Sequence, residues 1–174
     1  MKIELRLATS TDVPALQNMA VRSYHQHFPY LWTPKGLQTY LEQYYDLDTF
    51  YGFVEAPDRF VHLACAQEEI AGYLVTQTQK NWNGEPCGFY IHRIYMLSEF
   101  AGQGIGSMLM AKAEELASVS KCSYLWLEVM QSSKDSIAFY EKKGFQIVSP
   151  YHFDILPMKT EDLAAMWIMK KPID

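Results

Sequence analysis

The sequence predicts a mixed α/β (α+β) domain, in which a twisted mixed sheet of about six to seven strands carries helices on both faces. Three features support this prediction. Two strand-like runs within residues 59–79 are joined by a short polar turn, as in an antiparallel hairpin. A strand–helix–strand pattern follows over residues 88–129, as in a parallel crossover. The length of 174 residues suits one domain with its own core.

The N-terminal third is expected to form one strand and two helices. Residues 3–7 alternate apolar and charged side chains, which is typical of a half-buried strand. Ser10 or Thr11 can cap a first helix, whose apolar residues recur at helical spacing. A Thr-Pro pair at 33–34 begins a second helix that runs to about residue 45, with proline at the tolerated first position. An aromatic-rich loop of residues 25–32 connects the two.

The rest of the chain alternates between strands and helices. The expected elements are, in order, strands over 59–66, 70–79 and 88–97, a helix over 104–119, a strand over 124–129, a helix over 133–142, and strands over 145–148 and 164–169. The strand over 124–129 is almost entirely apolar, as expected when both of its faces are covered. Gly144 ends the short helix over 133–142. The resulting order is β-α-α-β-β-β-α-β-α-β-β.

Composition excludes several classes of protein. Hydrophobic residues make up 49% of the chain and charged residues 20%, which excludes a disordered or collagen-like polymer. The formal net charge of -5 gives no general attraction to nucleic acid or to anionic lipid, so neither is an expected partner. No segment approaches the roughly 20 apolar residues that span a bilayer, and the first residues lack the hydrophobic block of a signal peptide. We therefore expect a cytoplasmic protein with a single domain over residues 1–174.

No metal site is expected. Cys65, Cys87 and Cys122 are widely separated and form no Cys-x-x-Cys pair, so neither a zinc site nor a disulfide framework is indicated. His25 and His27 lie too close to the proline loop to form a metal pair on one face of a helix. Each cysteine is expected to act as a small buried apolar residue rather than as a nucleophile that carries an acyl group.

The densest motif is the turn of residues 97–107, which has glycines at 102, 104 and 106 between a predicted strand and a predicted helix. Glycines let the backbone approach a ligand, and a helix start presents unpaired N–H groups and a positive dipole end. The turn therefore favours a phosphate or pyrophosphate site, the alternative being a tight turn with glycines for packing. The turn is not a P-loop, because the lysine that a P-loop requires is missing from it. A fold that binds a nicotinamide dinucleotide would need glycine where Ser107 stands. Glu128, at the end of the next strand, does match the acidic residue that binds the ribose in such folds.

Two segments together resemble a known superfamily. Residues 93–106, Arg-Ile-Tyr-Met-Leu-Ser-Glu-Phe-Ala-Gly-Gln-Gly-Ile-Gly, resemble the acetyl-CoA motif of the GNAT superfamily of N-acetyltransferases, which reads Arg/Gln-x-x-Gly-x-Gly/Ala after a strand. Residues 132–145 resemble its next segment, Asn-x-x-Ala-x-x-Phe-Tyr-x-Lys-x-Gly-Phe. The Arg-Ile-Tyr stretch is also similar to a bacterial branch that includes spermidine/spermine acetyltransferases. The resemblance implies a GNAT-like fold and direct acetyl transfer from acetyl-CoA to a primary amine of a small molecule, either a polyamine or amino-acid-like, in a ternary complex.

The resemblance also implies that residues 88–148 form the acetyl-CoA-binding core. The strand that ends near residue 97 would diverge from the strand over 124–129, often at a bulge. The pantetheine arm would bond backbone groups in that gap, and the pyrophosphate would lie on the N–H groups of the glycine turn. The implied coenzyme-binding residues are Ile94, Tyr95, Met96, Gly102, Gln103, Gly104, Ile105, Gly106, Ser107, Ser133 and Tyr140.

Three side chains are candidates for the chemistry. The resemblance implies that Tyr140 protonates the departing thiolate, the alternative being a buried structural tyrosine. Attack needs a neutral amine, whereas the ordinary pKa of such an amine is roughly 10, so a base must remove a proton directly or through water. His92 is one candidate, because an unperturbed pKa of about 6.5 would leave it mostly neutral at pH 7. Glu128 on the neighbouring strand is the second, and a backbone N–H near Ile94 would polarise the thioester carbonyl.

Two positions depart from the superfamily pattern. Ala101 stands where arginine or glutamine is usual, and Ser133 stands where asparagine is common, although serine can still cap the helix. These departures leave open a catalytically weak GNAT-fold module that senses CoA or binds a partner.

The helices and loop of residues 11–56 are expected to form the acceptor side. Aromatic residues crowd positions 24–60 and can either contact an amine's cation or fill the core. Anionic contacts to the amine are available from Glu42, Asp46, Asp48 and Glu55. The strand over 164–169 is expected at an edge of the sheet, where it can support a homodimer.

Overall fold

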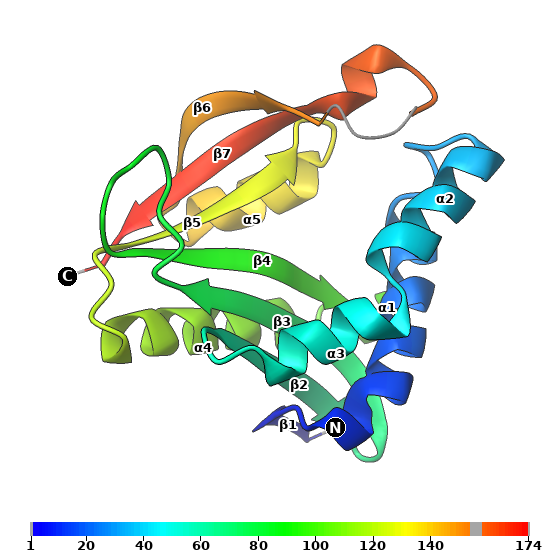
Figure 1. Cartoon of the computed structure of the whole chain (residues 1–174), viewed down its shortest axis with the longest axis horizontal. Helices are drawn as coiled ribbons and strands as arrows, with labels where there is room; N and C mark the ends of the chain where they lie inside the picture. Colours follow the sequence, from blue (N-terminus) through cyan, green and yellow to red (C-terminus); the bar gives the residue numbers. More distant parts are fainter. Residues whose placement is uncertain (1, 154–157, 174) are drawn as a thin grey trace.

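The computed structural model describes residues 2–153 and 158–173, which form one mixed sheet with helices on both faces (Figure 1). The elements are β1 (Ile3–Leu7), α1 (Val13–His27), α2 (Pro34–Tyr44), α3 (Leu47–Glu55), β2 (Arg59–Ala66), β3 (Glu69–Thr78), β4 (Gly88–Met96), α4 (Ile105–Val119), β5 (Tyr124–Met130), α5 (Lys134–Lys142), β6 (Gln146–His152) and β7 (Ala165–Pro172). The sheet has seven strands within these residues, in the order β1-β2-β3-β4-β5-β7-β6. The predicted fold class is confirmed.

Within the described residues, one pair of neighbouring strands runs parallel, near the centre of the sheet. Strands β1 to β4 pair antiparallel, whereas β4 and β5 pair parallel. Strand β7 pairs antiparallel with both β5 and β6. Helix α4 makes the connection that a parallel pair requires, which is the crossover predicted from the sequence.

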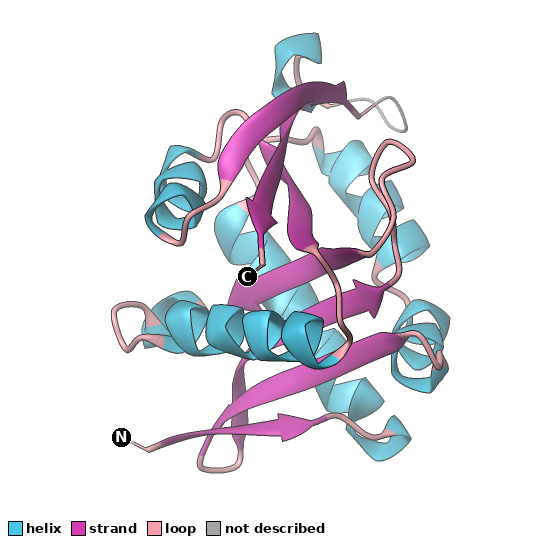
Figure 2. Cartoon of the chain, turned by 90° about the vertical axis from the view of Figure 1, so that its left-hand side faces the viewer, coloured by secondary structure: helices cyan, strands magenta, loops and turns pink. Residues whose placement is uncertain are grey.

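Adjacent residues of β3 show that helices cover both faces of the sheet. A Cβ atom at Gly72 would lie 3.0 Å from Ile105 of α4. The ring of the next residue, Tyr73, lies 6.2 Å from that of Phe50 in α3. Because successive side chains of a strand point to opposite faces, α4 and α3 pack on opposite sides. Figure 2 shows this layering, with helices in front of and behind the strands.

Helix α3 was not expected from the sequence. Its segment is rich in aromatic residues and contains Gly52, and both features disfavour a helix locally. Burial of Phe50 and Phe53 against the sheet favours it instead. The Asp46 carboxylate caps the helix by accepting the N–H of Thr49 at 2.9 Å.

The predicted edge position of the strand over 164–169 is wrong. This strand, β7, lies between β5 and β6, and β6 forms the edge. The chain turns back after β6 and inserts its last strand inside the sheet, so order along the chain misleads here. The basis given for a homodimer at residues 164–169 is therefore lost.

Smaller differences concern the ends of elements. Thr33 caps α2 as predicted, accepting the N–H of Gly36 at 3.1 Å. Ser10 and Thr11 instead belong to a short 3-10 turn capped by Thr9, and α1 begins at Val13. Strand β6 continues past Pro150, which an edge strand tolerates. None of the described helices is both long and apolar enough to cross a membrane.

Candidate active site

Strands β4 and β5 separate halfway along their length. They pair from Gly88 with Tyr124 to Ile91 with Leu127, and both strands then continue without pairing to each other. The pairing of β4 with β3 skips His92, because Ile91 faces Thr76 and Arg93 faces Val75. This β-bulge bends β4 at the point where it leaves β5. The divergence and bulge expected from the sequence resemblance are both present.

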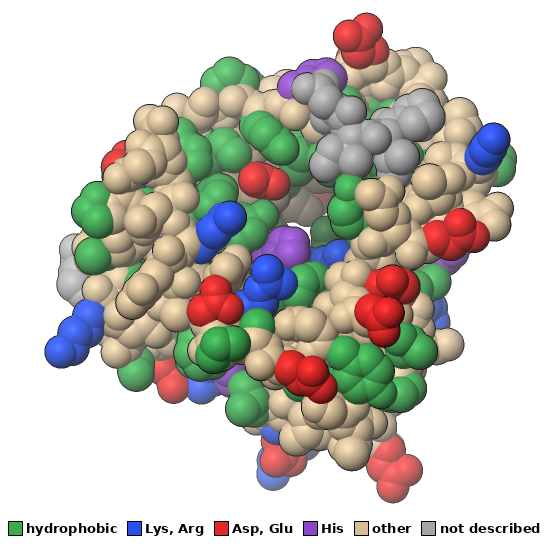
Figure 3. All heavy atoms as spheres, in the orientation of Figure 1, with side chains coloured by type: hydrophobic (Ala, Val, Ile, Leu, Met, Phe, Trp, Pro, Cys, Tyr) green, Lys and Arg blue, Asp and Glu red, His purple; other side chains and the backbone are tan. Residues whose placement is uncertain are grey.

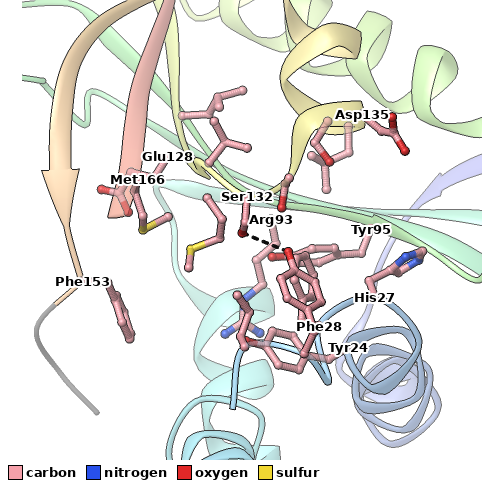
Figure 4. A pocket seen from close by; sticks show the side chains of 18 of the residues that line it. Tyr24, His27, Phe28, Arg93, Tyr95, Glu128, Ser132, Asp135, Phe153 and Met166 are labelled. Atoms are coloured by element: carbon pink, nitrogen blue, oxygen red, sulfur yellow. Dashed lines mark hydrogen bonds between the residues drawn. The ribbon is translucent and has the colours of Figure 1, made fainter. Parts of the chain in front are cut away.

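The divergence opens a cavity of about 630 Å³ between β4, β5, α1 and the start of α5. Figure 4 shows Glu128 on one side and Tyr24, Phe28 and Tyr95 on the other. Seven of the predicted site residues line this cavity: His92, Ile94, Tyr95, Met96, Glu128, Ser133 and Tyr140. Within the turn of residues 97–107, Ser98 and Ala101 line the cavity, whereas residues 102–107 do not.

The three glycines of the turn are required for different structural reasons. Gly102 and Gly104 have φ angles of +77° and +79°, and a Cβ atom at either position would meet nothing within 4 Å. Glycine is needed at both positions because other residues rarely adopt a positive φ. Gly104 also precedes the first N–H groups of α4, which have no partner within the helix. A Cβ at Gly106 would lie 2.9 Å from Cε of Met96 and 3.6 Å from Phe139, so this glycine permits close packing. The open helix start suits an anionic phosphate group.

His92 is a neutral side chain in an aromatic setting. Its ring lies 5.1 Å from that of Phe53 and 5.4 Å from that of Tyr90. Burial lowers the pKa of His92 to about 3, and the positive charges of Arg93, Arg59 and Lys80 act in the same direction. It is therefore neutral at pH 7, as predicted, but it holds a proton far less well than an unperturbed histidine would.

Glu128 responds to the same burial in the opposite direction. Desolvation raises the pKa of its carboxyl above the ordinary value, while a hydrogen bond from Tyr90 and the charge of Lys80 oppose the rise. The pKa of Glu128 therefore moves toward neutral pH and that of His92 away from it. A carboxylate of raised pKa is the better proton acceptor of the two.

Tyr140 presents a protonated phenol to the cavity. Its side chain is only 9% exposed and its ring packs 5.4 Å from Phe139 and 5.9 Å from Phe145. Burial raises the pKa of Tyr140 well above the ordinary value, so the hydroxyl keeps its proton at neutral pH. No described residue hydrogen-bonds this hydroxyl, which leaves it able to donate to a ligand.

The predicted cap by Ser133 is wrong. Its side chain makes no capping hydrogen bond to α5, although its carbonyl accepts the N–H of Ile137 at 3.0 Å. The hydroxyl that makes a hydrogen bond just before α5 belongs to Ser132, whose Oγ lies 3.1 Å from the Tyr30 hydroxyl oxygen (Figure 4).

Sequence reasoning missed the contacts that α1 makes with the end of β4. The Met96 carbonyl accepts hydrogen bonds from Ser23 Oγ at 3.0 Å and from His27 Nε2 at 2.9 Å. The N–H of Ser98 donates to Gln26 Oε1 at 2.8 Å. These partners are about 70 residues apart in sequence, and no local pattern signals them.

Comparison with known proteins identifies the arrangement. The model of the acetyltransferase (GNAT) family matches residues 17–145. The chain belongs to this family. It is an acetyl-CoA-dependent N-acetyltransferase.

Three similar proteins illustrate the range of the GNAT family around this chain. An uncharacterized N-acetyltransferase in the pepI 3' region of Lactobacillus delbrueckii subsp. lactis is 26% identical over 153 residues, covering 87% of this chain and 88% of that protein. The thialysine N-epsilon-acetyltransferase of Bos taurus is 35% identical over 78 residues, covering 44% of this chain and 45% of that enzyme. The crystal structure of PaiA N-acetyltransferase from Thermoplasma acidophilum, in complex with coenzyme A, has a TM-score of 0.79 at 18% identity and covers 99% of both chains.

The aromatic residues of this acetyltransferase divide between cavity and core. Tyr24, Phe28, Trp32 and Tyr40 line the cavity, with the Trp32 and Tyr40 rings stacked 4.7 Å apart. Tyr45, Phe50 and Phe53 are buried behind them. None of the acidic residues expected to contact the acceptor lines the cavity; these are Glu42, Asp46, Asp48 and Glu55.

Arg93 is the residue for which the sequence suggested no role. It lines the cavity of the acetyltransferase, is 7% exposed, and lies over the ring of Tyr45 at 4.1 Å. Its Nη2 donates to the Tyr44 carbonyl at 2.7 Å, whereas Nη1 has no hydrogen-bond acceptor among the described residues. Its place in the Arg-Ile-Tyr stretch, next to His92, was the sequence signal for it.

No metal centre is found in the described part of the chain, which holds no group of three or more His, Cys, Asp or Glu placed to bind an ion. The three cysteines are unpaired.

Proposed function

We propose that this enzyme transfers the acetyl group of acetyl-CoA directly to a primary amine of a small molecule, with both substrates bound at once. The observation that carries the proposal is the cavity at the divergence of β4 and β5, which Glu128, His92 and Tyr140 all line. The partial similarity to thialysine N-epsilon-acetyltransferase supports a small amine as acceptor. The similarity in fold to PaiA in complex with coenzyme A supports the choice of donor.

The donor side relies on backbone groups. Acetyl-CoA supplies the activated acetyl group as a thioester. The first N–H groups of α4, from Ile105 to Ser107, would hold the pyrophosphate next to Gly104. The N–H of Leu97 bonds the Ala71 carbonyl of β3, so the alternate residues Ile94 and Met96 direct their N–H groups away from β3. Their N–H groups are therefore available to the pantetheine arm and to the acetyl carbonyl.

The proton transfers are assigned to two side chains. Glu128, with its raised pKa, accepts the proton that the incoming ammonium group loses. Neutral His92 accepts a hydrogen bond from the amine and orients its lone pair. Tyr140 donates its phenolic proton to the departing thiolate, since its pKa keeps that proton in place until a stronger base develops beside it. The nitrogen loses its second proton as the amide forms, and this proton returns to the Tyr140 oxygen and restores the phenol.

We also propose that the enzyme acts in the cytoplasm. Its three cysteines are unpaired, which suits a reducing compartment.

The test combines binding and turnover. Acetyl-CoA and CoA are expected to raise the melting temperature while NAD does not, and free thiol release is expected in the presence of at least one small amine. Stabilisation by NAD alone would overturn the proposal. Binding of acetyl-CoA without turnover on any amine would instead support the CoA-sensing or partner-binding module suggested by Ala101 and Ser133.

A further inference from the structure

An apolar surface extends from Glu128 along one face of the sheet. Glu128 and Met130 are two residues apart on β5, so their side chains lie on the same face. Met166 of β7 pairs with Met130, and both methionines line the cavity. The N–H of Phe153 donates to the Ala164 carbonyl at 3.0 Å, which continues the pairing of β6 with β7 and places Phe153 on the same face as Met166. The surface therefore leads from the proposed base to the ring of Phe153 (Figure 4).

Aromatic rings continue this surface to the opposite side of the cavity. The Phe153 ring lies 6.2 Å from that of Tyr40 and 6.4 Å from that of Trp32. The Tyr40 ring lies 5.0 Å from that of Tyr24, and the Tyr24 ring lies 4.9 Å from that of Phe28. All five residues line the cavity and form the aromatic wall: Tyr24, Phe28, Trp32, Tyr40 and Phe153. Figure 3 shows the hollow at the centre of this face, bordered by hydrophobic side chains together with a few charged ones.

Hydrogen bonds hold the aromatic wall in place. Trp32 and Met158 form an isolated antiparallel β-bridge, and the N–H of Lys159 donates to the Leu31 carbonyl at 2.9 Å. The indole Nε1 of Trp32 donates to the Tyr24 hydroxyl at 2.9 Å. These bonds fix the positions of the rings, which lowers the entropic cost of ordering them around a ligand.

The aromatic wall carries no charge of its own. Burial raises the pKa of the Tyr24 and Tyr40 hydroxyls above the ordinary value, so both stay protonated at neutral pH. Among the described residues that line the cavity, the carboxylates are Glu128 and Asp135, and Asp135 lies at the start of α5, away from Phe153 (Figure 4). The second ammonium group of a diamine would therefore meet no carboxylate of the described residues at the wall, and burial of an unpaired charge is unfavourable. An apolar ring instead gains free energy from burial there.

Arg93 further disfavours a cation at the wall. Its guanidinium lies 4.1 Å from the centre of the Tyr45 ring, which is 5.1 Å from the Tyr24 ring and 5.8 Å from the Tyr40 ring. This positive charge behind the rings weakens the attraction that their faces offer to an ammonium group. The charges around the wall therefore favour a neutral ligand body.

We propose that the acceptor is an arylalkylamine, whose ring packs against the aromatic wall while its amine lies at Glu128. Met130 and Met166 contact the alkyl linker between the two, where their flexible thioether side chains adapt to its shape. The inference rests on the proposed function and narrows it, since a monoamine with an aromatic body would be acetylated in preference to a polyamine.

The test uses three amines with the same three-carbon chain. 3-Phenylpropylamine, propylamine and 1,3-diaminopropane differ at the far end, which bears a phenyl ring, a hydrogen atom or a second amino group, and spermidine serves as the polyamine. We expect kcat/KM for 3-phenylpropylamine to exceed each of the other values roughly tenfold or more, because only its ring is buried at the wall.

Variants of Phe153 assign the preference to the aromatic wall. Phe153→Ala should raise KM for 3-phenylpropylamine roughly tenfold and leave KM for propylamine and the Kd for acetyl-CoA unchanged. Phe153→Leu, which keeps an apolar side chain against β7, should restore part of the affinity. Ile147→Ala is the matched control, because Ile147 is an exposed apolar residue of the same strand and does not line the cavity.

Other results would overturn the inference and leave the proposed function intact. These are a preference for spermidine or 1,3-diaminopropane, equal kcat/KM for 3-phenylpropylamine and propylamine, or an equal effect of Phe153→Ala on every amine. If no amine is turned over, the proposed function fails, and titration calorimetry on the CoA-bound protein decides the inference. Binding of 3-phenylpropylamine that exceeds that of propylamine and is weakened in Phe153→Ala supports it; absent or equal binding overturns it.

Discussion

The two halves of the site are built from different materials. The proposed coenzyme half would consist of backbone groups in one short stretch, the end of β4, the glycine turn and the first turn of α4. The proposed acceptor half would consist of side chains that α1, α2, β4 and β5 bring together from distant parts of the chain. A site made of backbone N–H groups tolerates a change such as Ala101, because no particular side chain supplies its hydrogen bonds. A site made of side chains depends on the burial and charge of each one.

His92 and Glu128 illustrate that dependence. Burial disfavours the charged form of both, so it lowers the pKa of the histidine and raises that of the carboxyl. The same physical effect therefore weakens one candidate base and strengthens the other. The difference in pKa is the reason that the proposal makes Glu128 the base and leaves His92 to orient the amine, and it can be tested directly.

The largest effect is expected for Glu128→Gln. Loss of the base should lower kcat/KM on the order of 10²-fold, whereas His92→Gln should lower it by roughly tenfold or less. The acid limb of the pH profile, along which activity rises with pH, should reflect a pKa above the ordinary 4.5 and should disappear in Glu128→Gln. Glu68→Gln, in the exposed turn between β2 and β3, is the control. A larger loss for His92→Gln would reverse the assignment.

Tyr140→Phe should lower kcat by roughly 10- to 100-fold with little change in acetyl-CoA affinity, because only the leaving-group proton is removed. Tyr30→Phe removes a hydroxyl at the same rim and should leave kcat within about threefold. Steady-state thiol release measures both variants. An unchanged kcat for Tyr140→Phe would make that tyrosine structural.

Gly104→Ala tests the coenzyme half. Alanine at a φ of +79° costs about 1–2 kcal/mol and displaces the helix start, so the Kd for acetyl-CoA should rise about tenfold. Gly84→Ala is matched, with a φ of +76° and open space around it, and should lose similar stability without loss of coenzyme affinity. Equal affinities in the two variants would contradict a phosphate site at this turn.

The last prediction concerns the pH dependence of stability. An unfolded histidine gains a proton below its ordinary pKa of 6.5, and folded His92 does so only below about 3. The free energy of unfolding should therefore fall as the pH drops through this window, by up to about 1.4 kcal/mol per pH unit. Urea titrations of His92→Gln should show a shallower fall, while His62, whose pKa burial also lowers, contributes equally in both proteins. Parallel curves would mean that His92 is not buried as described.

Prediction from the sequence succeeded where local signals were strong. The strands and helices from residue 88 to 142 were predicted from apolar periodicity and from glycines at their ends, and they lie within a few residues of their expected bounds. Helix α3 was missed because its stability comes from burying Phe50 and Phe53, not from propensity. The edge assignment failed because β7 returns to the inside of the sheet.

By itself, the sequence determined the family, the glycine turn and the identity of Tyr140, His92 and Glu128 as candidates, because those signals lie within short segments. Only the tertiary structure decided the protonation behaviour of His92 and Glu128, the α1 contacts to Met96 and the burial of Arg93 over the ring of Tyr45. Burial and electrostatic fields depend on residues far apart in the chain, so no local pattern records them.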